Sequence, residues 1–368
     1  MRYAYLSCLV LVCLALFITP VLSSPKSGLI IYSSSSDTLC SIDAAGRNKR
    51  MIGVFKNLSG IEAIHQSKQL LVRCTGARVS DRDILRVASF NGKERRVIHI
   101  GGGYLLSPDG SHIAWPEGVR LKLWSMHTTN IQIIPMPGRI VDFRWGPTGK
   151  KLLVLVKQTG FSLNCSLYLL DLYGAMKAMP TGVVQAEFSP DGKWILYSHK
   201  EKDLKLTLWK LLLSPTAKAR RICSLPADKL LTSFQISPDN RSVLLIYDTI
   251  AETSGYSPFT CVDSNSLKTI SIAAGKRIAF SPDGKYIAYI SGTERTLCCT
   301  DLSGQQQKII DEHCSAGYSW TPNGDILFYR EQTNNLPAGL YNVHSDGSSL
   351  KFITKTGADP LFIWIADR

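Results

Sequence analysis

The sequence predicts an all-β fold, a β-propeller built from four-stranded antiparallel blades. The main observation is a Ser-Pro-Asp-Gly string that recurs about every 40 residues, a repeat length typical of propeller blades. Strand-forming residues flank each copy, and a second turn signal of the type Asp-x-x-Gly follows many of them. The three full copies begin at Ser107, Ser189 and Ser281, and the weaker copies begin at Gly146, Ser237 and Thr321.

The unit from Val183 to Cys223 shows how each repeat predicts four strands, here called A to D. Strand A covers residues 183–188. Pro190 suits the end of a strand because it has no N–H for a ladder, and Asp191-Gly192 supplies a tight turn. Strand B returns over residues 193–198, and a second hairpin supplies strands C and D at Leu206–Leu213 and Lys218–Cys223.

The B strands can be read in every unit, because each follows a turn signal and is rich in Val, Ile, Leu and Tyr. We predict them at Gln69–Cys74, His112–Trp115, Lys151–Val156, Trp194–Ser198, Ser242–Tyr247, Tyr286–Ile290 and Asp325–Tyr329.

Two unpaired strands at the chain ends predict how the propeller closes. Leu29–Tyr32 reads as a B strand without an A strand, and Pro360–Ile365 reads as an A-like strand without a B strand. Pairing them completes one blade and removes exposed sheet edges. With seven whole units this gives eight blades. Seven is the alternative, because the unit around His65–Lys68 has lost its Pro-Asp-Gly.

The repeat resembles the PD40 (WD40-like) repeat of the TolB-type propellers, which also form the N-terminal propeller of prolyl oligopeptidase relatives. The resemblance covers residues 29–366. It implies a propeller fold and leaves the function open, because propellers carry many unrelated activities. Because the repeats fill the chain, we expect neither the additional N-terminal domain of TolB nor a hydrolase domain.

The N-terminus predicts an exported protein. Arg2 precedes an apolar run, Leu9–Ile18, and Pro20 ends this run shortly before small residues that suit cleavage. We therefore expect a signal peptide at residues 1–24, a single propeller domain at residues 25–368, and a periplasmic or secreted location in a bacterium. A retained membrane anchor is the alternative, although the apolar run is short for a membrane span. No other segment predicts a transmembrane span.

The net charge predicts an acidic partner. The chain has 42 Lys and Arg residues against 29 Asp and Glu, a formal charge of +13. A basic protein outside the cytoplasm meets acidic proteins and anionic envelope polymers, whereas nucleic acid does not fit the expected location. The densest basic runs fall near D strands, where charge also protects sheet edges. We expect a monomer that binds a protein or an anionic envelope polymer.

Eight cysteines lie outside the expected signal peptide, scattered over most blades at positions that suit a small apolar residue. This pattern predicts mainly buried free thiols, with one or two disulfides at most. No zinc site is expected, because Cys298 and Cys299 are adjacent and point to opposite faces of a strand.

Candidate binding residues are expected on one face, which we call the loop-rich face: it carries the B–C loops and the D–A connections. Loops of this kind often carry function. The long B–C loops are Thr75–Asp83, Lys157–Cys165, His199–Lys205, Asp248–Pro258 and Glu331–Ala338. The candidates there and at the mouth of the central channel are His99, Arg139, His199, Asp228, Lys229, Tyr256, Lys276 and His313.

Motifs for catalysis are missing from the sequence. Gly317–Thr321 lacks the last glycine of a nucleophile elbow, and Gly101–Gly103 precedes a strand where a phosphate loop would precede a helix. We therefore expect no catalytic residues and no cofactor, and predict a non-catalytic binding or scaffold module. The alternative is a propeller lyase or lactonase with a channel metal, which would require His99, His199 and His313 to converge.

Overall fold

The structure is a computed structural model of the full chain. Most of its strands lie where the sequence predicts them. It describes residues 28–64, 68–76, 83–100, 103–128, 130–157, 165–201, 205–214, 216–225, 229–249, 257–263, 269–291, 295–358 and 360–366. All regular structure in these ranges is β-strand, which confirms the all-β prediction. None of these residues forms a helix that could cross a bilayer.

The described residues divide into two compact units. Unit 1 comprises residues 28–100 and 274–366, and unit 2 comprises residues 103–273. Unit 2 is therefore one continuous stretch of chain, whereas unit 1 is made from two stretches that come from the two ends of the sequence.

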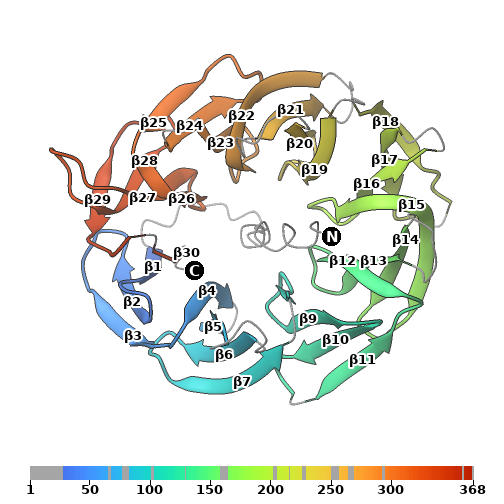
Figure 1. The fold of residues 1–368 in the computed structure, drawn as a ribbon, viewed down its shortest axis with the longest axis horizontal. Helices are drawn as coiled ribbons and strands as arrows, with labels where there is room; N and C mark the ends of the chain where they lie inside the picture. Colours follow the sequence, from blue (N-terminus) through green and yellow to red (C-terminus); the bar gives the residue numbers. More distant parts are fainter. Residues whose placement is uncertain are drawn as a thin grey trace, which may run out of the picture. The chain divides into compact units, whose positions relative to one another are not determined.

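Unit 1 contains four sets of four antiparallel strands (Figure 1). Written from strand A to strand D, the first set is β30 (Phe362–Ala366), β1 (Gly28–Ser33), β2 (Thr38–Asp43) and β3 (Arg50–Val54). The second is β4 (Leu58–Ile64), β5 (Gln69–Cys74), β6 (Asp83–Ser89) and β7 (Glu94–Ile100). The others are the end of β22 (Thr269–Phe280) with β23 (Tyr286–Ser291), β24 (Thr296–Asp301) and β25 (Lys308–Asp311), and β26 (Cys314–Trp320), β27 (Asp325–Arg330), β28 (Gly339–His344) and β29 (Lys351–Thr354).

Unit 2 also contains four such sets. The first two are β8 (Leu105–Leu106), β9 (His112–Glu117), β10 (Arg120–Ser125) and β11 (Ile131–Pro135), and β12 (Arg139–Trp145), β13 (Lys151–Lys157), β14 (Cys165–Asp171) and the start of β15 (Met176–Phe188). The last two are the end of β15 with β16 (Trp194–Lys200), β17 (Leu206–Leu212) and β18 (Arg220–Ser224), and β19 (Lys229–Ile236), β20 (Ser242–Thr249), β21 (Ser257–Asp263) and the start of β22.

Every predicted B strand is confirmed, from β5 to β27. The unit that has lost its Pro-Asp-Gly still forms the four-stranded sheet β4 to β7, so the reason for preferring seven blades does not hold. The number of blades stays a prediction. The closure of all of them into one ring stays a prediction.

Two predicted D–A connections lie inside long strands. Thr181-Gly182 falls within β15 and Gly275-Lys276 falls within β22, so each of these strands is the D strand of one set and the A strand of the next. The chain bends there without leaving the ladder: Gly182 has φ +74° and stands where the register of β15 against its neighbours shifts. Such a positive φ costs glycine little.

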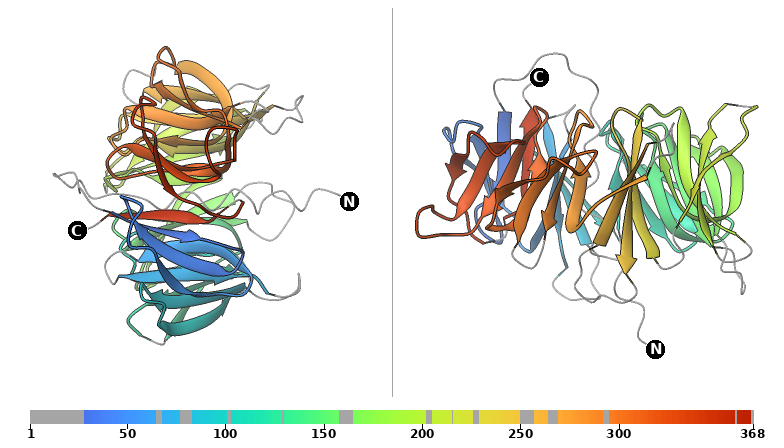
Figure 2. Two further views of the ribbon diagram at one scale, coloured as in Figure 1. Left: turned by 90° about the vertical axis from the view of Figure 1, so that its left-hand side faces the viewer. Right: turned by 90° about the horizontal axis from the view of Figure 1, so that it is seen from above.

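The chain ends pair as the sequence predicted. β1 lies antiparallel to β30, with Leu29 opposite Ile365 and Tyr32 opposite Phe362. Figure 2 shows the red C-terminal strand beside the blue N-terminal strands. The first sheet of unit 1 is therefore closed by residues more than three hundred positions apart.

The Ser-Pro-Asp-Gly motif is a network of short hydrogen bonds. The Ser189 hydroxyl donates to Asp191 at 2.6 Å and accepts the Trp194 N–H at 3.0 Å, while Asp191 accepts the Lys193 N–H at 3.1 Å. The copies that begin at Ser107, Ser237 and Ser281 repeat these three bonds. The serine is buried in every case, so the repeat in the sequence reflects a buried polar contact that has to be satisfied.

The cores lie between neighbouring sheets, because both faces of each blade are apolar. Tyr32, Tyr247, Tyr289 and Tyr341 are among the largest side chains that are fully buried. The outer D strands alternate instead between buried and exposed positions, as Ile52 and Met51 show on β3.

Candidate functional site

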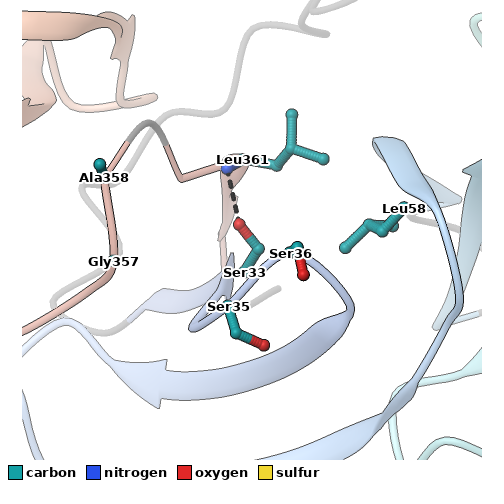
Figure 3. Close-up of a pocket in the computed structure, with 7 residues that line it drawn as sticks. All are labelled: Ser33, Ser35, Ser36, Leu58, Gly357, Ala358 and Leu361. Atoms are coloured by element: carbon teal, nitrogen blue, oxygen red, sulfur yellow. Dashed lines mark hydrogen bonds between the residues drawn. The ribbon is translucent and has the colours of Figure 1, made fainter.

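A pocket of about 230 Å³ opens on the loop-rich face of unit 1. It lies where the B–C loop of the first sheet meets the connection into β30 and the start of β4. Figure 3 shows Leu58 and Leu361 on opposite sides of the pocket, with Ser36 between them. The lining residues are Ser33, Ser35, Ser36, Leu58, Gly357, Ala358 and Leu361.

Ser33 holds the two segments of this pocket together. Its backbone N–H donates to the Leu361 carbonyl at 2.8 Å, and its hydroxyl accepts the Leu361 N–H at 2.9 Å. Ser33 is buried. Gly357 lies close to the next residue, since an ideal Cβ at Gly357 would be 3.6 Å from the Ser34 carbonyl. The polar groups of Ser33 are therefore used within the fold, whereas Ser35 and Ser36 are exposed at the opening.

The chemistry of the pocket favours an uncharged group. None of its seven lining residues carries a charge. The walls combine two leucine side chains with serine hydroxyls and backbone groups, a composition typical of sites that bind an apolar group and orient it by a few hydrogen bonds. The pocket offers no pair of groups for acid–base catalysis.

A charged cluster lies elsewhere on the loop-rich face of unit 1. Asp311, at the end of β25, is almost fully buried and forms an ion pair with Arg330 at the end of β27. Asp311 also accepts the His313 N–H at 2.8 Å. Burial raises the pKa of Asp311 and raises that of the nearby Cys314 thiol to about 12. Cys314 is therefore an inert thiol, and the cluster ties consecutive sheets together.

A second charged cluster lies in unit 2 on two neighbouring A strands. Arg144 of β12 bonds Asp142 at 2.6 Å and lies 3.4 Å from Glu187 of β15. The Arg144 guanidinium therefore contacts two carboxylates. Burial raises the pKa of Glu187 to about 7, with the Asp142 charge adding to the effect and Arg144 opposing it.

His199 lies in a polar corner of unit 2. Its Nδ1 is buried without a hydrogen-bond partner and stands 3.8 Å from Glu201. Thr207 holds that carboxylate by donating to it at 2.9 Å, and accepts the Trp209 indole N–H at 2.8 Å. Gly182 leaves the room for the imidazole, since an ideal Cβ there would lie 2.7 Å from its Nε2.

The predicted site residues are distributed over both units. Lys276 of β22 and His313 are exposed in unit 1, and Arg139 is exposed at the start of β12 in unit 2. His99 lies on β7 and Lys229 begins β19, but their side chains are not described. Asp228 and Tyr256 lie outside the described residues, as does the predicted signal peptide. These eight residues stay a prediction.

Among the described residues, no group of three or more His, Cys, Asp and Glu side chains is placed to hold a metal ion. All eight described cysteines are free thiols, six of them buried, as the scattered pattern predicted.

No motif in the sequence indicates that this pocket is a site. Its Ser33–Ser36 tract is visible as a run of serines, and Gly357 is visible as part of a D–A connection. Their combination depends on β1 and β30 lying side by side. The predicted pairing of the two terminal strands already implied that these segments lie next to each other.

Comparison with known proteins supports the fold. No model of a known protein family and no curated protein matches the sequence. The solved structures it resembles include dihydro-heme d1 dehydrogenase NirN in complex with DHE, with a TM-score of 0.61 and 14% identity over 90% of this chain and 73% of that one. A eukaryotic initiation factor matches with a TM-score of 0.58 and 11% identity over 93% of this chain and 98% of that one. Oligogalacturonate lyase in complex with manganese matches with a TM-score of 0.55 and 15% identity over 87% of this chain and 98% of that one.

These likenesses, together with the repeated four-stranded antiparallel sheets, show that the chain has a β-propeller fold. At such low identity they show the fold alone, and the matched proteins have unlike activities. Membership of the TolB-type PD40 family stays a prediction.

Proposed function

We propose that this protein is a non-catalytic, exported propeller that binds a protein or an envelope polymer through its loop-rich face. The observation that carries the proposal is the pocket of unit 1, which is lined entirely by residues of that face. Its uncharged walls suit binding of an apolar or hydroxyl-bearing group. The N-terminal residues and the positive charge support an exported protein that meets acidic surfaces.

Blocking the pocket tests this function. Ala358 is exposed and lines the pocket, so Ala358→Trp fills it with an indole. The matched control is Ala45→Trp, an exposed alanine in the β2–β3 turn at the other end of the same sheet. The wild type and both variants serve as baits for an envelope extract, used before and after protease treatment.

We expect the wild type and Ala45→Trp to retain the same component and Ala358→Trp to lose it. Loss of that component after protease treatment identifies a protein partner, and its persistence identifies a polymer. Equal retention by all three baits would contradict a role for the pocket.

A further inference from the structure

Arg277 has an unusual backbone conformation. Its φ of +53° is uncommon for a residue other than glycine. It stands in a β-bulge of β22, where the register against β23 shifts between Lys276 and Ala279. Bulges redirect side chains, and strained residues that the surroundings hold in place concentrate at functional sites.

Two residues of β26 contact Arg277. The Tyr318 hydroxyl lies 2.5 Å from the Arg277 carbonyl, and its single proton is shared between that carbonyl and the Ala288 carbonyl. The guanidinium lies against Gly317, where an ideal Cβ would stand 2.6 Å from Nη1 and 2.8 Å from Cζ. Gly317 itself has φ +97°. Tyr318 thus holds the backbone of Arg277, and the contact with Gly317 limits the positions open to its exposed side chain.

The guanidinium of Arg277 has no acidic partner among the described residues. Several other arginines of unit 1 do have one. Examples are Arg47 with Asp43, Arg73 with Asp83, Arg295 with Glu331, and Arg330 with Asp311. Arg277 thus presents an oriented but unpaired positive charge, and its planar fork fits a carboxylate with two parallel hydrogen bonds.

We propose that Arg277 is a docking residue for a single carboxylate of a protein partner. This rests on the proposed function and names the chemistry of the ligand. Cys314, beside this arginine, also experiences the charges of Asp311 and Glu331, and Glu312 is exposed in the same segment. Asp311 and Glu331 are paired with Arg330 and Arg295, so Glu312 is the exposed acid of this segment that a polymer with repeated negative charges would meet. A single carboxylate on a protein can reach Arg277 without lying along this segment.

The test is a titration of the full-length mature protein followed by NMR of the arginine Nε–Hε groups. The probe is N-acetylglycine, which carries one carboxylate, and inorganic phosphate and polyglutamate are titrated separately. We expect N-acetylglycine to saturate the Arg277 signal at a concentration about tenfold below that for an exposed arginine elsewhere, because a positioned fork loses less freedom on binding. The reference is Arg241, exposed beside an A–B turn.

Variants show whether charge or geometry matters. Arg277→Gln should abolish the probe-dependent shift of the Gly317 amide, and Arg277→Lys should weaken binding because it keeps the charge and loses the fork. Gly317→Ala should weaken binding with the arginine still present. Arg241→Gln should change nothing. The two Arg277 variants alter an exposed side chain, so they keep the test valid if Gly317→Ala fails to fold.

Three results would overturn the proposal: no preferential saturation of Arg277, equal binding of Arg277→Lys and wild type, or binding of phosphate or polyglutamate without N-acetylglycine. The last result would replace the protein carboxylate by a phosphate or a polyanion. Because these probes do not enter the pocket test, a failure here leaves the result with Ala358→Trp unaffected.

Discussion

At the residue scale, arginine–carboxylate contacts join neighbouring strands in both units. Arg144 serves both Asp142 and Glu187 in unit 2, and Arg330 serves a buried acid in unit 1. Glu187 and Asp311 contact their arginines from a different strand, so no short motif predicts these two pairs. Lys276 was predicted as a candidate binding residue at a D–A connection, whereas Arg277 beside it was not. The reason is that a β-bulge does not change the hydrophobic pattern of the sequence.

Glu187 should make the stability of unit 2 depend on pH. Its pKa is about 7 in the native state against an ordinary 4.5. Between these values the native state binds more protons than the unfolded chain, so the free energy of unfolding falls as pH rises through the interval. Glu187→Gln should remove this part of the slope and raise the Tm at pH 8 by about 2–4 °C, the shift that goes with roughly 1 kcal/mol.

Thermal melts from pH 4.5 to 8 measure this effect. Glu312→Gln, which removes an exposed acid, is the control and should follow the wild type. Parallel pH profiles for wild type and Glu187→Gln would show that this carboxyl does not titrate differently in the folded protein.

At the element scale, the repeat determines the strands better than it determines their connections. The B strands follow directly from turn residues and strand-forming runs. The D–A connections do not, because in β15 and β22 the chain passes from one sheet to the next without leaving strand geometry. A glycine such as Gly182 reads as a loop signal in sequence, whereas its role is to bend a continuous strand.

The serine of the repeat should stabilise the A–B turn measurably. Ser189 is fully buried, and within this turn its hydroxyl forms hydrogen bonds with the Asp191 carboxylate and the Trp194 N–H. Ser189→Ala should cost about 1–3 kcal/mol, because it leaves the Trp194 N–H unsatisfied. Urea unfolding measures the loss. Ser35→Ala, at an exposed serine, should be neutral, and equal stability of both variants would mean that the motif acts through its backbone alone.

At the scale of the whole molecule, the predicted alternative is a metal-dependent propeller enzyme. We expect the purified mature protein and its His99→Ala/His199→Ala/His313→Ala variant to contain no stoichiometric metal, because the three histidines are scattered over different repeats of the sequence. Elemental analysis of both proteins decides this. One metal per chain in the wild type that is lost in the variant would favour the lyase or lactonase alternative.

The pairing of β1 with β30 has a consequence for the order of folding. Unit 2 is one uninterrupted stretch, so it can assemble as soon as that stretch has been synthesised. The first sheet of unit 1 begins at Gly28 but lacks its innermost strand until Ala366 is available. The earliest strands therefore wait with an open hydrogen-bonding edge while the rest of the polypeptide emerges, which makes the nascent N-terminal segment the part most dependent on protection by a chaperone.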